Sequence, residues 1–321
     1  MLNIMQNLSK RDPNQLALRK AIKAPAGHKV VAADSSQIEA RMLAYIARQD
    51  DLVQTFRDRR DPYSEMAANF NVGMTAEEIK SGAKSGNKTA KVYRNVGKTA
   101  ILSAGYGVGW KKFADTLIRQ GTKLYDNIEQ HYNMAQWCHT VYRQSVPQIV
   151  GLWKRCQGVV ELLEAGQSGQ FGGPNDNLFT FGPEPMMPGK TPVPTITMPS
   201  GFKLRYPELR VQVNDKGKPE YVYTRIRGKN KTAQRIYGSS LVENCTQGIA
   251  FQLLMWQACR MQEAGIQLKG NVHDSWYTIV PESEAEKTSE LMQYWMSQTP
   301  PWLPDFPVAC EAEIGDDFTV A

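Results

Sequence analysis

A short apolar run that ends in a carboxylate constrains the fold of this chain more than any other feature. The pattern that includes "KVVAADSSQIEARMLAYIA" (29–47) predicts a buried strand at 28–34, a turn, and an amphipathic helix from Ile38 to about Phe56. Asp34, Glu39 and Arg41 gather where the strand gives way to the helix. A carboxylate at the end of a buried strand is unfavourable unless it is paired or binds a metal. Asp34 is therefore a candidate metal ligand, and the alternative is an Asp that ends a strand and caps the next turn.

A second Asp occupies a similar position late in the chain. The segment "GNVHDSWYTIVP" (270–281) predicts two short strands around His273 and Asp274. If the strand that ends at Asp34 neighbours these strands, the two carboxylates converge on a point that can hold two hard cations. Two-metal phosphoryl transfer requires that arrangement, although a simple strand-ending turn remains the alternative here too.

A row of basic residues between these two segments is the third candidate. Its members follow one another at intervals of four, three, three and four residues: Lys84, Lys88, Lys91, Arg94 and Lys98. Much of the row would share one face of a helix. Such a row can bind a triphosphate, with Arg94 as a bidentate donor and Lys98 as a point charge, but it is also typical of a solvated helix face.

The remaining pattern alternates between helical and β-like segments. We expect a helical block, a β-rich excursion, a long helix, a further helix and a tail strand at 61–162, 166–235, 240–264, 285–298 and 308–314. The 321 residues are 41% hydrophobic, which suits a globular core, and the net charge of +6 permits a polyanionic partner without requiring one.

Cysteine usage and hydropathy bear on location. None of the five cysteines forms a C-x-x-C pair, so the pattern indicates neither a disulfide framework nor a structural zinc site. We interpret His131, Cys138 and His139 as ordinary helix residues, because no further Cys or His pair stands at ligand spacing. No segment approaches a membrane span or a signal core, so we expect a cytoplasmic protein without a membrane partner.

Four segments, taken in order, resemble the polymerase domain of family A DNA polymerases, particularly those of bacteriophages. "DSSQIEAR" (34–41) is similar to the first palm motif, D-[YF]-S-Q-I-E-x-R, and "RNVGKTAILSAGYG" (94–107) is similar to the fingers motif, R-x3-K-x7-YG. "VHDSW" (272–276) is similar to the later palm motif V-H-D-E, and "YGSSLVENCTQ" (237–247) resembles the helix that precedes it in phage enzymes.

The resemblance implies an α+β fold of the right-hand polymerase type. Its palm is an antiparallel sheet with helices and its fingers are helical, while the thumb and exonuclease domains are absent. The implied division is palm at 1–45 and 236–321, with fingers at 46–235 that include a β-rich excursion near 166–235.

The implied activity is template-directed DNA synthesis, in which a dNTP is joined to a primer 3′-hydroxyl. By resemblance, two Mg²⁺ ions are held by Asp34, Asp274 and the backbone carbonyl of Ser35. Lys98 is the implied proton donor to the leaving pyrophosphate.

The implied dNTP-binding residues are Glu39, Arg94, Lys98, Leu102 and Tyr106. Arg94 and Lys98 hold the triphosphate, Glu39 crowds out a 2′-hydroxyl and Tyr106 stacks near the templating base. Leu102 stands where the family usually has an aromatic residue, so we expect a slower enzyme.

The implied DNA contacts are Asn244, Gln247 and His273. Arg41 is grouped with them, with a structural role against the next helix as its alternative. Ser275 replaces the Glu that usually follows the catalytic Asp, which removes one negative charge near the metals.

Asp34 lies near the start of this chain, where the family has thumb and exonuclease sequence. We therefore expect a second polypeptide that carries the thumb, with or without proofreading, and a chain that is the catalytic subunit of a split phage replicative polymerase in the host cytoplasm.

Two other interpretations remain open at this point. One is a non-catalytic replisome subunit, which would have no reason to retain Asp34, Glu39, Arg94, Lys98 and Asp274 together. The other is a relative of single-subunit RNA polymerases, against which Glu39 argues.

Overall fold

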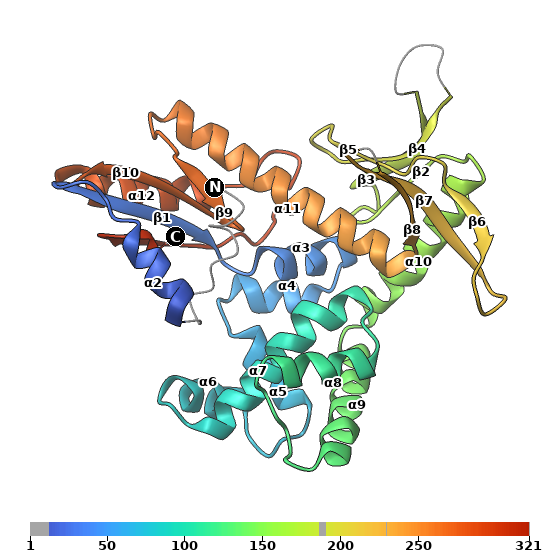
Figure 1. Ribbon diagram of the computed structural model, residues 1–321, viewed down its shortest axis with the longest axis horizontal. Coiled ribbons are helices and arrows are strands. Elements are labelled where there is room, and N and C mark those ends of the chain that lie inside the picture. The colour runs from blue at the N-terminus through green and yellow to red at the C-terminus, as the bar shows by residue number, and fades with distance from the viewer. Residues whose placement is uncertain (1–12, 186–190, 229, 321) are drawn as a thin grey trace. The chain divides into compact units, whose positions relative to one another are not determined.

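The computed structural model describes residues 13–185, 191–228 and 230–320, and it divides the chain into two compact units (Figure 1). The first unit combines Met1–Ile38 with Ile249–Ala321, and the second is Glu39–Gly248. The Met186-Met187 pair of the β-rich excursion lies outside the described residues. The palm and fingers boundaries given above stay predictions.

The first unit is built on a four-stranded antiparallel sheet in the order β11-β1-β10-β9. Its strands are β1 (His28–Ser35), β9 (Gly270–Val272), β10 (Ser275–Pro281) and β11 (Cys310–Gly315). Four consecutive residues of β1, at 30–33, are fully buried because the strand is paired on both edges and covered on its faces. The expected pairing of the strand that ends at Asp34 with the strand that follows Asp274 is confirmed.

Helices and short turns cover this sheet. They are α2 (Pro13–Ala21), η2 (Glu282–Glu284), α12 (Ala285–Met296) and η3 (Phe318–Val320). Helix α12 contacts β1 and β11, and α2 contacts η3 (Figure 1). Phe318 lies edge-on to Tyr277 with ring centroids 4.9 Å apart, and the Arg19 guanidinium lies 5.5 Å from the Phe318 ring. These contacts bury the C-terminal turn against the sheet.

The second unit begins with helices and continues with strands. The helical elements are α3 (Ile38–Ala47), α4 (Asp50–Arg57), α5 (Pro62–Asn69), α6 (Ala76–Lys84), α7 (Lys88–Ser103), η1 (Ala104–Tyr106), α8 (Trp110–Arg119), α9 (Ile128–Ser145) and α10 (Pro147–Glu164). Where the sequence predicted one helix over 38–56, the chain forms two. Arg48 adopts a left-handed φ of 61°, and the buried Gln49 side chain accepts from the Gln148 amide and donates to Asp51, which fixes the break.

The basic row is also divided. Lys84 ends α6, and the other four members lie on α7. Gly86 has a φ of 91°, and the Asn87 side chain accepts from the Ala90 amide at 3.0 Å to cap α7. A side chain that caps a helix start satisfies an amide that the helix itself cannot. Lys84 is therefore not on the helix that carries Arg94.

Two small antiparallel sheets follow, in the range where the sequence predicted a β-rich excursion. The first has β2 (Gly169–Phe171), β3 (Phe179–Glu184), β4 (Val193–Thr197) and β5 (Lys203–Arg205), and the second has β6 (Arg210–Val213), β7 (Pro219–Arg227) and β8 (Asn230–Ile236). The long helix α11 (Gly238–Glu263) comes next. The mixture of helices and antiparallel sheets confirms the predicted α+β class. No helix in the described ranges combines the length and apolarity needed to cross a bilayer.

Close packing of α5 against α7 depends on one glycine, and this gives the first prediction. A Cβ at Gly97 would overlap the Tyr63 carbonyl oxygen. We expect Gly97→Ala to lower the free energy of unfolding by about 1–3 kcal/mol, because forced overlap in a packed interior costs that much. The matched control is Gly158→Ala on α10, where nothing lies within 4 Å of an added Cβ. Denaturant titration should show the control unchanged or more stable, since Ala also favours helix; equal losses in both variants would contradict the packing argument.

Candidate active site

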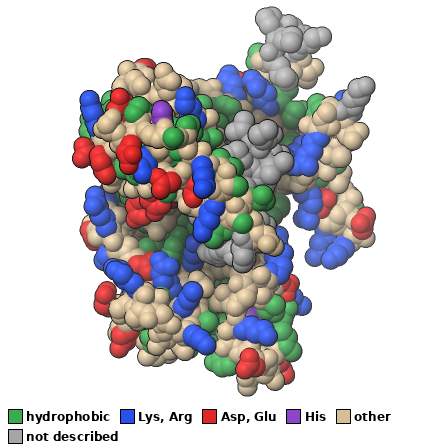
Figure 2. All heavy atoms as spheres, turned by 60° about the vertical axis from the view of Figure 1, so that its left-hand side comes forward, with side chains coloured by type: hydrophobic (Ala, Val, Ile, Leu, Met, Phe, Trp, Pro, Cys, Tyr) green, Lys and Arg blue, Asp and Glu red, His purple; other side chains and the backbone are tan. Residues whose placement is uncertain are grey.

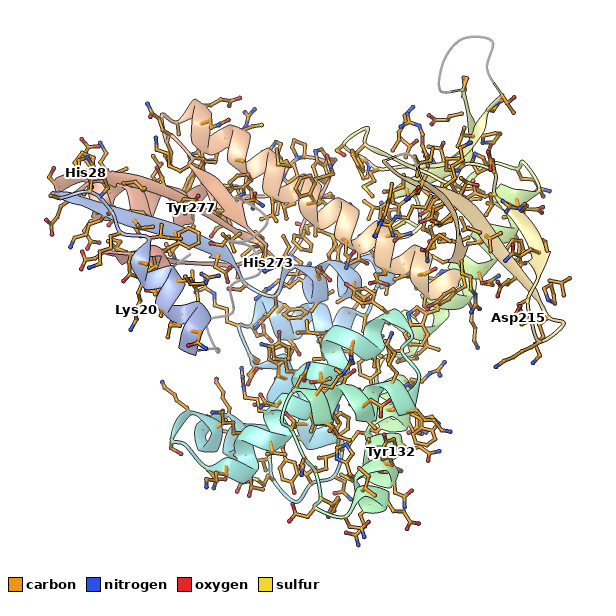
Figure 3. The ribbon with its side chains drawn as sticks, in the orientation of Figure 1. Lys20, His28, Tyr132, Asp215, His273 and Tyr277 are labelled. Atoms are coloured by element: carbon orange, nitrogen blue, oxygen red, sulfur yellow. The ribbon has the colours of Figure 1, made fainter. Side chains whose placement is uncertain are left out.

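Two aspartates lie at the same end of the sheet in the first unit. Asp34 is paired directly with Ser275 across β1 and β10, and the Ser35 amide donates to the Asp274 carbonyl at 3.0 Å. Figure 3 places His273 at this end of the sheet and His28 at the other. The two-residue turn between β9 and β10 uses a left-handed His273, with a φ of 53°. The register thus brings together two residues that are 240 positions apart in the sequence.

The electrostatics of this end suit a cation. Burial raises the pKa of Asp274, and His273 offsets this only in part. Burial raises the pKa of the Cys310 thiol to about 12, and the nearby negative charge of Asp34 adds to the effect. Carboxylate oxygens are the donors that Mg²⁺ prefers, so the chemistry of the pair fits that ion. Among the described residues no group of three or more His, Cys, Asp or Glu side chains is arranged to hold a metal, and the assignment of Asp34, Asp274 and the Ser35 carbonyl as ligands stays a prediction.

One residue at this end was missed by the sequence analysis. Glu311 on β11 is paired with Asp34 on the side opposite Ser275, so the three residues form one row across the strands. Ser275 is 4% exposed, and its hydroxyl has no hydrogen-bond partner among the described residues. A tail strand was expected, but nothing in its composition indicated that it would pair with β1.

In the second unit, α7 presents Arg94 and Lys98 one turn apart. The Arg94 Nε donates to the Asp61 carboxylate at 2.7 Å, and its guanidinium lies 5.4 Å from the centroid of the Tyr63 ring. The Lys98 ammonium lies 5.7 Å from the same ring. Tyr63 is thus a shared platform for both cations, and such contacts orient a charge without neutralising it.

Asp61 also organises the start of α5. Its carboxylate accepts from the Tyr63 amide and from the Ser64 hydroxyl, so the residue that caps the helix also holds Arg94. Burial opposes ionisation of Asp61, but the hydrogen bonds from Arg94 and Ser64 outweigh it, and the pKa of the carboxyl is lowered. The sequence analysis missed Asp61 and Tyr63, because "DPYSE" carries only the signal of a helix cap.

Glu39 and Tyr106 are joined directly. The Tyr106 hydroxyl donates to the Glu39 carboxylate at 2.8 Å, and burial followed by the Glu39 charge raises the pKa of Tyr106. The backbone beside Tyr106 is held as well, since the Trp153 indole donates to the Gly105 carbonyl at 2.8 Å. Burial and the Glu39 charge also raise the pKa of Glu243. Glu39 therefore belongs to a fixed polar group.

The remaining candidates differ in exposure. Leu102 on α7 and Gln247 on α11 are exposed, whereas Asn244 is half-buried and donates to the Tyr206 hydroxyl at 3.2 Å. Arg41 is 6% exposed, donates to the Phe56 carbonyl and lies 4.6 Å from that ring, and burial lowers its pKa to about 10. These contacts favour the structural alternative for Arg41 over a DNA contact.

His131 and His139 have ordinary hydrogen bonds, as expected for helix residues. The His131 Nδ1 accepts from the Leu124 amide, and its Nε2 lies 3.3 Å from the Ala114 carbonyl. The His139 Nε2 lies 2.8 Å from the Val108 carbonyl. Both rings are therefore engaged by the backbone rather than arranged for a metal.

Comparison with known proteins bears on the family. Residues 3–150 match the family model "DNA polymerase family A". This segment is therefore similar to the family A DNA polymerases. It includes "DSSQIEAR" and "RNVGKTAILSAGYG", two of the segments on which the resemblance was based.

The match to a thermostable DNA polymerase I extends over nearly the whole chain. The thermostable DNA polymerase I of Thermus filiformis is 24% identical over 318 residues, which are 99% of this chain and 30% of that protein. DNA polymerase I of Pseudomonas aeruginosa is 37% identical over 75 residues, 23% of this chain and 8% of its own. The chain thus spans about 30% of the length of the thermostable relatives that it matches over nearly all of its residues.

A solved structure has the same fold. The polymerase domain of Pol1 from M. smegmatis, in complex with DNA primer-template and dNTP, superposes with a TM-score of 0.63 over 98% of this chain and 44% of that one. The sequence identity is 17%, so this likeness is one of fold. The chain has the fold of that polymerase domain.

The ion pair between Asp61 and Arg94 gives the second prediction. Since the folded pKa of Asp61 is lowered, its ionisation contributes stability that is present above the usual aspartate pKa of about 3.9 and is lost as the pH falls through the lowered value. Asn still caps helices, so Asp61→Asn removes mainly the charge. We expect a loss of about 1–3 kcal/mol in unfolding free energy at pH 7.

Denaturant titrations between pH 3 and pH 7 measure this difference. The gap between the unaltered chain and Asp61→Asn should narrow toward pH 3, and Asp126→Asn, in an exposed loop, should show no gap at any pH. If the difference in unfolding free energy between the unaltered chain and Asp61→Asn did not change with pH, the charge of Asp61 would make no contribution to stability.

Proposed function

We propose that this chain catalyses template-directed DNA synthesis, joining dNTPs to a primer 3′-hydroxyl by two-metal nucleotidyl transfer. The observation that carries the proposal is the placement of Asp34 and Asp274 at one end of two paired strands. The family match of residues 3–150 supports it, as does the fold shared with a polymerase domain that was solved with primer-template DNA and dNTP.

The first unit supplies the metal ligands. Asp34, Asp274 and the Ser35 carbonyl would hold Mg²⁺, which when bound would lower the pKa of the attacking hydroxyl and offset the negative charge of the leaving pyrophosphate. Burial of Asp274 makes its carboxylate costly to ionise alone, and a bound cation would offset that cost. Ser275, in place of a third acidic residue, lowers the negative charge at this end of the sheet.

The second unit supplies the nucleotide-binding side chains. Arg94, fixed by Asp61, and Lys98, above the Tyr63 ring, bind the triphosphate, and Lys98 gives a proton to the leaving pyrophosphate. Glu39, fixed by Tyr106, excludes the ribose 2′-hydroxyl. Tyr106 stacks near the templating base, while Asn244, Gln247 and His273 contact the DNA.

Primer extension tests the activity and is the third prediction. With Mg²⁺, dNTPs and a recessed template at low salt, we expect extension by the unaltered chain and a loss of about a thousandfold or more in Asp274→Ala, since metal-held charge supplies several kcal/mol. EDTA should abolish extension, and Asp126→Ala should retain it. Extension that survives in Asp274→Ala would overturn the metal assignment.

Sugar selection gives the fourth prediction. We expect Glu39→Ala to raise the use of ribonucleotides relative to deoxynucleotides by about 100-fold. A pocket that no longer excludes the 2′-hydroxyl by a steric clash discriminates only weakly between the two sugars. Tyr106→Phe keeps the carboxylate but removes its donor, so it should raise ribonucleotide use less. Single-nucleotide incorporation kinetics measure both, and an unchanged ratio in Glu39→Ala would exclude Glu39 from sugar selection.

The split architecture, which we propose together with a bacteriophage origin on the resemblance of the motifs, can be tested by the same primer-extension assay. The relatives named above are bacterial polymerases, and the second polypeptide has no support from the comparisons. Extension that appears only after a thumb-bearing chain is added would support a split polymerase. Extension by this chain alone, with the processivity of a complete enzyme, would contradict it.

A further inference from the structure

The hairpin formed by β7 and β8 carries a concentration of positive charge that the proposed activity does not use. Residues 221–242 contain no Asp or Glu but five basic residues: Arg225, Arg227, Lys229, Lys231 and Arg235. Lys229, at the turn, lies outside the described residues. On the face drawn in Figure 2, basic and acidic side chains are otherwise interspersed, so a run of one sign is a local feature.

The strand register defines the geometry of this charge. Arg225 is paired with Thr232, Ile226 with Lys231, and Arg227 with Asn230. Alternate residues of a strand face opposite sides, so Arg225 and Arg227 share one face and Lys231 lies on the other. All of these residues are exposed. Strand β6 pairs with β7 only over 219–222, so beyond it the hairpin is a two-stranded ribbon of β7 and β8.

Two acidic residues in or beside this sheet have polar partners of their own. Glu220 forms an ion pair with Arg235 at 2.9 Å, and Glu208 accepts from the Thr224 hydroxyl. Within the described ranges, Arg225, Arg227 and Lys231 form no ion pair, although the charge of Lys231 helps to lower the pKa of Glu208. Three exposed cations on one ribbon are therefore available to a polyanion.

The shape and composition of the ribbon favour duplex DNA as that polyanion. A two-stranded antiparallel ribbon is narrow enough to enter the major groove, and phosphate contacts from Arg and Lys do not depend on base sequence. Single-stranded DNA is usually held on aromatic rings, and residues 224–236 contain none. We propose that Arg225, Arg227 and Lys231, near the end of the hairpin, bind the phosphate backbone of duplex DNA. The choice of DNA as the polyanion rests on the proposed function.

Duplex binding measured against salt tests this inference. The probe is a blunt fluorescent duplex without a recessed primer end, titrated by anisotropy without dNTP over a series of KCl concentrations. Neutralising three phosphate contacts changes the slope of log K against log salt by about 2 to 3. We therefore expect the triple variant Arg225→Gln, Arg227→Gln, Lys231→Gln to have a slope shallower by that amount and an affinity weaker by about tenfold or more.

A matched control separates the hairpin from net charge. The variant Lys20→Gln, Lys269→Gln, Lys287→Gln removes the same three charges from exposed positions of the first unit. Equal effects in the two triple variants would overturn the proposal, as would unaltered duplex binding in the hairpin variant or a loss confined to a single-stranded probe. Absence of duplex binding by the unaltered chain would overturn it too. Thermal unfolding of each variant confirms that the fold is retained.

The outcome is independent of catalysis. The blunt duplex offers no primer end and the titration contains no dNTP, so the measured binding does not require catalysis. A hairpin effect on binding, with no extension by the unaltered chain either alone or with an added thumb-bearing chain, would overturn the proposed function and leave this inference standing.

Discussion

The antiparallel register between β1 and β10 is the constraint on which the catalytic proposal depends. It pairs Asp34 with Ser275. At the same end of the sheet, the Ser35 amide donates a hydrogen bond to the Asp274 carbonyl. A slip of one residue would turn every β1 side chain to the opposite face of the sheet. The buried run at 30–33 opposes such a slip, because shifting it would expose apolar side chains and bury Asp34. The register of β1 and β10, which the burial of apolar side chains maintains, thus fixes the positions of Asp34 and Asp274 relative to each other.

The second unit uses a different device, in which a polar partner fixes each functional side chain. Asp61 holds Arg94, Tyr63 lies against both Arg94 and Lys98, and Tyr106 holds Glu39. Exposed ion pairs contribute little to stability, but a partly buried and hydrogen-bonded pair restricts the conformations of a long side chain. The energetic role of these contacts is orientation, and that is why a charge-removing change at Asp61 should act through Arg94.

Sequence reasoning succeeded where the signal is local. The strand at 28–34, the two short strands around His273 and the long helix near 240–264 follow from periodicity and turn residues, and the structure has them within a few residues. It failed where a distant partner decides. The helix break at Arg48 depends on a hydrogen bond between Gln49 and Gln148, and the row that joins Glu311 to Asp34 depends on the pairing of a tail strand. No pattern within either segment encodes those partners.

The cations of the chain fall into two groups that differ in their partners, and the difference matches the two kinds of contact proposed. Arg94 is ion-paired and rests on Tyr63, so its position is defined before any ligand arrives, as transfer of a phosphoryl group requires. Arg225 and Arg227 are exposed on a ribbon and form no ion pair among the described residues. Exposed cations suit a phosphate backbone that presents the same group at every step and demands no single register. We therefore assign the ion-paired cation Arg94 to phosphoryl transfer, and the exposed cations Arg225 and Arg227 to DNA binding.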